Sequence, residues 1–221
     1  MVNAFVSSRF KLILPHMHID FQVLAFKGSE VLDQPFFIQV QVVSDNPSLD
    51  LESLLHQPAY LDFGDAQEGL HGQVYAIGRD DPGRRITRYH LTLVPRLAYL
   101  AHRRNQRIFQ QRSVPQIIAA VLEQHGILAD AYAFELGPVV YPPRTFCVQY
   151  AESDLHFIQR LCEEEGIHYH FRHSADAHLL VFGDDQTVFR RLPAQRYCAA
   201  GGPQADTRVI QRFDVRLATR S

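Results

Sequence analysis

The first ninety-odd residues alternate between apolar and polar positions with a period of two, which is typical of half-buried β-strands. In FFIQVQVV (36–43), apolar side chains occupy every second position from Phe36, and Gln39 and Gln41 lie on the other face. RITRYHLTLV (85–94) alternates in the same way. Further strands are predicted in DFQVLAF, AYLDF and HGQVYAI, which are residues 20–26, 59–63 and 71–77.

Polar turn residues separate these segments, at KGS (27–29), SDNP (44–47) and DDPG (80–83). Many short strands joined by polar turns favour an antiparallel barrel or sandwich over a doubly wound α/β sheet. We therefore predict a first β-barrel-like domain over residues 1–95.

The pattern changes after Pro95. LAYLAHRRNQRIFQQR (97–112) is apolar at one end and basic at the other, and we interpret it as a link between two modules. Two capped helices are then predicted, at about 114–125 and 154–165. Ser113 and Ser153 suit the two N-caps, and Gly126 and Gly166 suit the two C-termini. Strand alternation returns in HYHFRH, HLLVF and FDVRLA, which are residues 168–173, 178–182 and 213–218.

Composition gives little support for a strongly charged partner. The formal net charge is −2, which argues against a global attraction to nucleic acid or to an anionic membrane. The N-terminus shows no signal-peptide core, and no apolar run reaches the length of a membrane span, so stable membrane insertion is not expected. Cys147, Cys162 and Cys198 match neither a zinc knuckle nor a disulfide framework, and we expect reduced, mostly buried thiols.

The segment DLHFIQRLCEEEGIHYHFRH (154–173) contains the most suggestive chemistry. His168 and His170 are two positions apart on a predicted strand, a possible pair of metal ligands for a metal-dependent hydrolase. Alternation with the apolar residues explains the same pattern, so we expect scaffold, with no metal and no cofactor. Glu163, Glu164 and Glu165 lie in the last turn of a helix, where negative charge opposes the macrodipole. Arginines such as Arg160, Arg172 or those of the basic segment would compensate them.

Residues 96–112 contain five arginines and no acid: Arg96, Arg103, Arg104, Arg107 and Arg112. One hypothesis is nucleic-acid binding, with Tyr99 and Phe109 as stacking platforms. The overall charge favours the other hypothesis, an ion-pair strip between subunits in which Arg103, Arg104 and Arg107 meet acidic neighbours. The chain shows no GxGxxG, P-loop, HExxH, GxSxG or paired CxxC motif. No catalytic residue is predicted, and we expect a protein that is not an enzyme.

Two blocks of the sequence resemble a known family. FCVQYAESDLHFIQRLCEEEGIHYHF, taken with LTLVPRLAYLAHRRNQRIFQQRSVPQIIAAVLEQHGI, closely resembles the N-terminal region of the VgrG spike proteins of type VI secretion. That region is in turn similar to the hub of phage tail baseplates. The likeness runs from about residue 5 to about residue 190.

The resemblance implies a fold class and a structural role. The fold would be mainly β with α+β character, formed by antiparallel β-barrel-like domains plus two short capped helices. A second α+β hub domain would span 96–221, and the chain would end within the hub. Such hubs form homotrimers that dock on a hexameric Hcp-like tube, contact baseplate proteins, and carry a puncturing needle and effectors through later segments. The protein would then be cytoplasmic in the producing cell before export by the type VI machine. A hub of a prophage or other contractile tail is the alternative.

Overall fold

The structure is a computed structural model that describes residues 9–64, 68–80, 86–189, 196–197 and 209–210. Residues up to Asp185 form one compact unit, and Gln186–Ser221 form another. The strand expected at 213–218, Cys198 and most of the predicted turn at 80–83 lie outside the described residues. The domain boundary near residue 95 stays a prediction.

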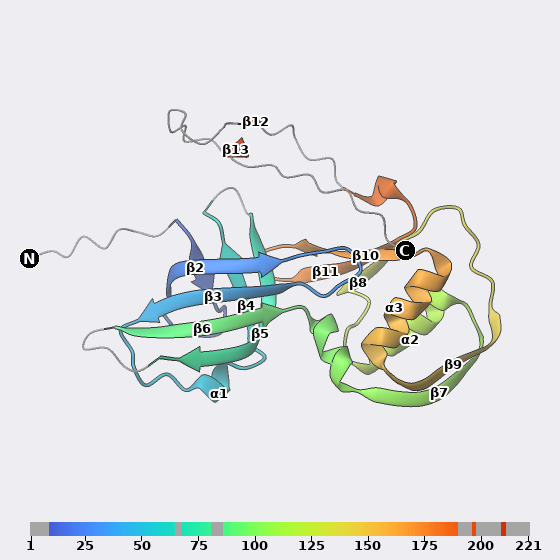
Figure 1. The fold of residues 1–221 in the computed structure, drawn as a ribbon, viewed down its shortest axis with the longest axis horizontal. Helices are drawn as coiled ribbons and strands as arrows, with labels where there is room; N and C mark the ends of the chain where they lie inside the picture. Colours follow the sequence, from blue (N-terminus) through green and yellow to red (C-terminus); the bar gives the residue numbers. More distant parts are fainter. Residues whose placement is uncertain (1–8, 65–67, 81–85, 190–195, 198–208, 211–221) are drawn as a thin grey trace, which may run out of the picture. The chain divides into compact units, whose positions relative to one another are not determined.

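The described elements follow one another along the chain as strands, two α-helices of more than one turn, and short helical turns (Figure 1). In order they are β1 (Lys11–Ile13), β2 (Gln22–Ser29), β3 (Phe37–Ser44), α1 (Leu51–Leu54), β4 (Pro58–Asp62), β5 (Gly69–Arg79), β6 (Thr87–Val94), η1 (Arg96–His102), β7 (Arg104–Arg112), α2 (Val114–Gln124), β8 (Tyr132–Glu135), β9 (Arg144–Ser153), α3 (Asp154–Glu165), β10 (His168–His173), β11 (His178–Gly183), η2 (Gln186–Val188), β12 (Arg196–Tyr197) and β13 (Val209–Ile210).

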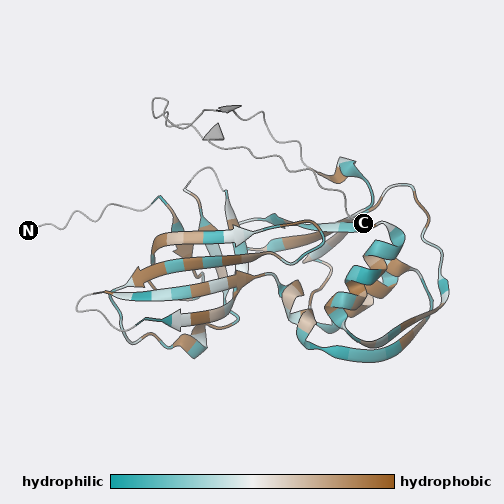
Figure 2. Cartoon of the chain, in the orientation of Figure 1, coloured by the Kyte–Doolittle hydropathy of each residue, from teal (hydrophilic) through white to brown (hydrophobic). Residues whose placement is uncertain are grey.

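The first six strands close into an antiparallel barrel in the order β1-β2-β3-β6-β5-β4. Closure depends on β1, which pairs with β2 on one side and with β4 on the other. The interior of so small a barrel is filled by side chains. The predicted alternation is confirmed, because Val40, Val42 and Leu93 are almost fully buried while Gln39 and Gln41 are exposed. Figure 2 shows this as bands of opposite hydropathy along the strands.

Two details differ from the sequence-based expectation. The turn expected at 27–29 is wrong, because β2 continues through Ser29 and the chain reverses over the next residues. The interpretation of residues 97–112 as a link is also wrong in its structure. It forms the short helix η1 and the strand β7, which pairs with β9 as a two-stranded antiparallel ribbon.

The helices α2 and α3 lie beside this ribbon (Figure 1), and both begin and end as the sequence predicts. The Ser113 amide donates to Gln116 Oε1 at 2.9 Å, which is half of a capping box. At α3, Ser153 Oγ accepts from the His156 amide at 3.1 Å. Gly166 ends that helix in the left-handed region at φ 68°, where a residue with a side chain would be strained.

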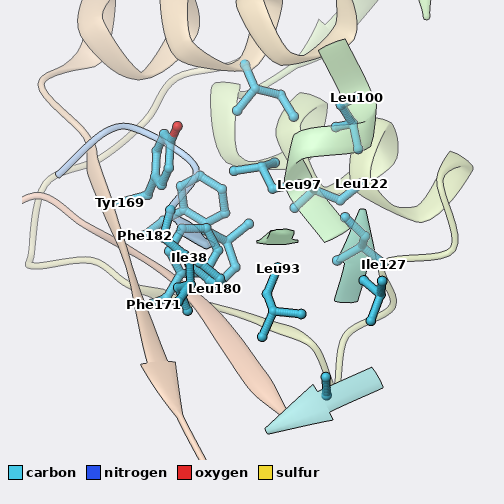
Figure 3. Packing of buried hydrophobic residues seen from close by; sticks show 14 of the residues in the cluster. Ile38, Leu93, Leu97, Leu100, Leu122, Ile127, Tyr169, Phe171, Leu180 and Phe182 are labelled. Atoms are coloured by element: carbon cyan, nitrogen blue, oxygen red, sulfur yellow. The ribbon is translucent and has the colours of Figure 1, made fainter. Parts of the chain in front are cut away.

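A second sheet has the order β10-β11-β8, and β8 joins β11 in parallel. It contacts β5 of the barrel through β10 and β11. One hydrophobic cluster continues from the barrel into this region (Figure 3). Leu93 of β6 belongs to the same cluster as Leu97, Leu122 and Phe182. The barrel and the helical region therefore share a core.

In the unit Gln186–Ser221, the described residues form the turn η2 and a short parallel pairing of β12 with β13. The Phe146–Tyr150 segment of β9, by contrast, belongs to the larger unit and exposes several large apolar side chains.

Candidate functional site

A fully buried carboxylate, that of Asp154, lies at the first position of α3 and is the centre of a polar cluster. Asn105 Nδ2 donates to both of its oxygens at 2.9 Å. Gln149 Nε2 and Arg107 Nη2 donate to Oδ1 at 2.8 Å each, and His125 Nε2 approaches Oδ2 at 2.7 Å. A buried charge is tolerated when it is paired and hydrogen-bonded in this way.

The donors come from three other elements, so the carboxylate joins four parts of the chain. Asn105 and Arg107 are the partly buried residues between exposed neighbours on β7, and Gln149 is buried on β9. His125 is the C-cap of α2. The Asp154 amide also donates to the Arg103 carbonyl at 2.9 Å. Loss of this carboxylate would therefore disturb the ribbon and both helices together.

The electrostatics of the cluster favour a charged Asp154. Burial opposes ionisation, but hydrogen bonds from Asn105, His125 and Gln149, together with the charge of Arg107, outweigh it and lower the pKa of Asp154. Burial lowers the pKa of Arg107, an effect that the neighbouring Asp154 counteracts. Arg107 is thus the counter-ion of a structural carboxylate within one chain.

A second charged network compensates the glutamates at the end of α3. Arg160 binds Glu152 at 2.6 Å and Glu164 at 2.7 Å. Arg144 binds Glu164 at 2.7 Å and Glu165 at 2.5 Å. Arg160 had been suggested by the sequence. Arg144 had not, because it lies about twenty residues upstream on β9 and its contact depends on the fold.

The other predicted site residues lie closer to solvent. Arg104 donates to the Ala151 carbonyl, and the half-exposed Arg103 side chain lies 4.0 Å from Asp154 Oδ2. Glu163 is exposed and lines a surface groove with Asp33. Arg172, another suggested partner of the glutamates, makes a two-point contact with Glu135 at 2.6 Å for each oxygen. An interface role for Arg103, Arg104 and Glu163 stays a prediction.

His168 and His170 lie on one face of β10, as predicted, with ring centroids 6.2 Å apart. Burial, Arg172 and His168 lower the pKa of His170. Glu135 acts in the opposite direction and raises that pKa, but both of its carboxylate oxygens are bound by Arg172. Within the described part of the chain, no three or more His, Cys, Asp or Glu side chains are arranged so that they could hold a metal ion.

A histidine cluster that the sequence did not reveal lies where the barrel meets the second sheet. His71 Nδ1 and His178 Nδ1 are 3.0 Å apart, and the His71 amide donates to His173 Nδ1 at 3.1 Å. Burial, then His173 and Arg96, lower the pKa of His71 to about 4. Burial, then His71, His173 and Arg96, lower the pKa of His178 to about 3. These imidazoles are therefore neutral near pH 7.

Cys147 and Cys162, the two cysteines within the described residues, have free thiols and are buried, as the sequence predicts. Burial, with a smaller effect of Asp33, raises the pKa of Cys162 to about 12. Burial also raises the pKa of Cys147. Neither thiol has the lowered pKa of a nucleophile. No helix in the described ranges has both the length and the apolar character needed to cross a bilayer.

Comparison with known families identifies the class of protein to which this closed barrel and helix-covered ribbon belong. The model of the phage tail baseplate hub (GPD) matches residues 29–221, and the chain belongs to this family.

Within the family, the chain is similar to spike proteins of type VI secretion. It is 57% identical to the type VI secretion system spike protein VgrG4b of Pseudomonas aeruginosa, over 100% of this chain and 27% of that protein. It is 54% identical to VgrG5 of the same organism, over 97% of this chain and 27% of that protein. The chain thus spans about a quarter of the length of these relatives.

Solved structures agree with the fold. The E. coli c3393 protein, described as a component of the type VI secretion system with structural similarity to the T4 tail proteins gp27 and gp5, matches with a TM-score of 0.78. It is 30% identical, and the match covers 86% of this chain and 57% of that one. A tail protein from Neisseria meningitidis has a TM-score of 0.59 at 12% identity, over 88% of this chain and 56% of that one, which shows the fold alone.

Proposed function

We propose that this chain is the hub region of a type VI secretion spike, that it assembles as a homotrimer, and that the trimer docks on a hexameric Hcp-like tube. In this function it contacts baseplate proteins on the producing cell's side. Segments outside the present sequence carry the needle and the effectors. The spike leaves the cytoplasm through the type VI machine.

The observation that carries the proposal is the likeness to spike proteins over nearly the whole of this chain, at 57% and 54% identity. The match to a solved type VI component at a TM-score of 0.78 supports it independently. The buried charges also fit a structural role, because Asp154 and its donors bind one another and present no free nucleophile.

A hub of a prophage or other contractile tail is the second candidate, and the match to the phage tail baseplate hub family favours it. The two candidates differ in the tube that they bind. Sequence identity favours the secretion tube, since two curated relatives that are 57% and 54% identical over the aligned residues of this chain are spike proteins.

Two measurements on the full chain test the proposal. Light scattering after size exclusion, over a wide concentration range, should show a mass that rises to three chains. Biolayer interferometry against purified tube hexamers should show binding of the trimer. A monomer at every concentration would contradict trimer formation by this chain. Binding to a phage tail tube and not to the secretion tube would favour the second candidate.

We also propose that the chain acts without a metal or cofactor. Elemental analysis of the purified protein is expected to find far less than one ion per chain. If about one zinc ion per chain is found, and if this zinc is absent when His168 and His170 are both replaced by alanine, the result would support the hydrolase hypothesis instead.

A further inference from the structure

The β7–β9 ribbon has one covered face and one bare face. On the covered face, Phe109 stacks on Phe157 of α3, and Cys147 and Gln149 are buried. On the other face, Ile108, Phe146, Val148 and Tyr150 are between 49% and 76% exposed. Ile108 lies directly opposite Val148 in the ladder, so these side chains form a continuous strip.

This strip is large for a monomer surface. An aromatic side chain offers about 150–250 Å². With two exposed aromatics and two aliphatic residues, the apolar area is on the order of 500 Å², at the upper end of what a monomer exposes in one patch. It also matches the apolar share, roughly 60%, of the ~800 Å² that each partner contributes to an interface of standard size.

The charges around the strip are all of one sign. Arg104 and Arg112, at the two ends of β7 beyond Ile108, are exposed. β7 contains no acidic residue, and Glu152 of β9 is bound by Arg160. We call this surface the outer ribbon face, and it consists of Arg104, Ile108, Arg112, Phe146, Val148 and Tyr150.

Packing of two outer ribbon faces against each other is unfavourable. A twofold axis would bring Arg104 of one copy either to Arg112 or to Arg104 of the other. Both arrangements oppose like charges without an acid between them, which is unfavourable at a close interface. The complementary surface is therefore a different one, with apolar side chains surrounded by acids.

The same chain carries such a surface at the turn between β2 and β3. Val31 and Leu32 are about half exposed there, next to Glu30 and Asp33. Glu163 of α3 lines the same groove as Asp33. We call these five residues the acidic tip patch.

The acidic tip patch is held in place by the rest of its own chain. The Asp33 amide donates to the Tyr169 carbonyl at 3.1 Å, and the Tyr169 amide donates to Asp33 Oδ1 at 2.8 Å. Gln159 Nε2 donates to the Asp33 carbonyl at 3.0 Å. Asp33 adopts a left-handed conformation, φ 63°, that these contacts maintain. A turn fixed in this way loses little entropy when it binds.

We propose that the outer ribbon face binds the acidic tip patch of a second copy of this chain. The contact joins unlike surfaces, so each copy has both halves and successive copies can close a ring. This inference rests on the proposed function, because it supplies the contact by which copies of the hub assemble. It also assigns Arg104 and Glu163 to opposite sides of that contact.

Mass measurements on variants of the full chain test the contact. The double variant Phe146→Gln/Tyr150→Gln and the single variant Leu32→Gln should each raise the dissociation constant of self-assembly by about tenfold or more. Val140→Gln is the matched control, because Val140 is 83% exposed and belongs to neither surface. Circular dichroism should show unchanged folding in all three proteins.

Cross-linking tests which surfaces meet. One chain carries Tyr150→Cys and another, of different size through a tag, carries Leu32→Cys, both with Cys198→Ser. A short bismaleimide should join the two chains in a mixture and should join neither variant to itself beyond the level of a Val140→Cys control.

The outcomes separate this inference from the proposed function. If the wild type forms trimers but the surface variants assemble normally, the outer ribbon face is not the contact and the proposed function stands. Self-linking of Tyr150→Cys would show an isologous contact and overturn the inference. A wild type that stays monomeric would contradict both the contact and trimer formation by this chain, and tube binding would then decide the rest of the function.

Discussion

The barrel and the ribbon with its helices are stabilised in different ways. In the barrel, six strands satisfy their backbone groups around a closed ring, and the interior is apolar at positions such as Val42 and Leu61. In the ribbon region, two strands have open edges, and a buried carboxylate holds the helices to them. The comparison shows that a region with little sheet of its own can be fixed by a polar centre, while one of its faces remains available for a partner.

The largest expected effect is at the polar centre. Asp154→Ala leaves Arg107 partly buried without its counter-ion, and removal of one partner of such a pair costs about 3–5 kcal/mol. We expect this loss in the free energy of unfolding from urea titration followed by circular dichroism. Asp130→Ala, at an exposed acid that belongs to neither proposed contact surface, is the control and should change stability by less than about 0.5 kcal/mol. A loss below about 1 kcal/mol for Asp154→Ala would show that the centre does not hold this region together.

In the barrel the comparable effect comes from packing. Leu93 is fully buried, and Leu93→Ala should destabilise by about 3 kcal/mol through lost burial and a residual cavity. Leu24→Ala removes the same atoms from a half-exposed position and should cost about 0.5 kcal/mol or less. Equal losses for the two variants, in the same urea titration, would contradict the assignment of the barrel interior.

The contact between barrel and second sheet should respond to pH. His71 and His178 have lowered pKa values, so the unfolded chain takes up protons at these residues first as pH falls. These residues cost no stability well above pH 6.5, and the free energy of unfolding then decreases as pH falls through 6.5 toward 4, by on the order of 2 kcal/mol for each histidine at pH 5. His173, Arg96, Glu30 and Asp176 also act on this cluster.

The measurement is the free energy of unfolding at pH 7 and at pH 5. His71→Gln should reduce the difference between the two values, whereas His156→Gln, at an exposed position of α3, should leave it unchanged. A difference that is the same in wild type and His71→Gln would exclude the histidine cluster as its source.

The smallest expected effect is in the network at the end of α3. Arg144, Arg160 and Glu164 are each partly exposed, and solvent screens their ion pairs. Glu164→Gln should cost about 0.5–1 kcal/mol at low salt and less at high salt. Leu128→Gln, at an exposed position and without a change of charge, should leave that salt dependence unaltered. An effect of Glu164→Gln that persists in 1 M salt would point to lost packing and not to charge.

The features that the sequence predicted are local ones. Alternation in 36–43 and 85–94 places the right side chains inside the barrel, because a strand's period does not depend on its partners. The limits of α2 and α3 follow from Ser113, Ser153 and the two glycines, which act on neighbouring backbone.

The features that it did not predict depend on pairing over long separations. Nothing near Arg107 shows that its partner is 47 residues away, or that Asp154 is buried and not simply an acid in a helical first turn. His71 and His178 are 107 residues apart. The segment that contains β7 was taken for a link because it is apolar at one end and basic at the other. The polar side chains on the inward face of β7 are explained by the carboxylate that they bind.

Barrel closure has a consequence for the order of events during synthesis. β3 can pair with β2 early, but Lys11 pairs with Asp62 and the other edge of β3 pairs with β6, so the ring cannot close until residue 94 has left the ribosome. At about 5–20 residues per second, the nascent chain carries an unpaired strand edge for some seconds. Arg107 lacks its counter-ion for a similar time, since Asp154 lies 47 residues further along the chain. A cell that makes this protein in quantity would therefore benefit from a chaperone that shields the early strands.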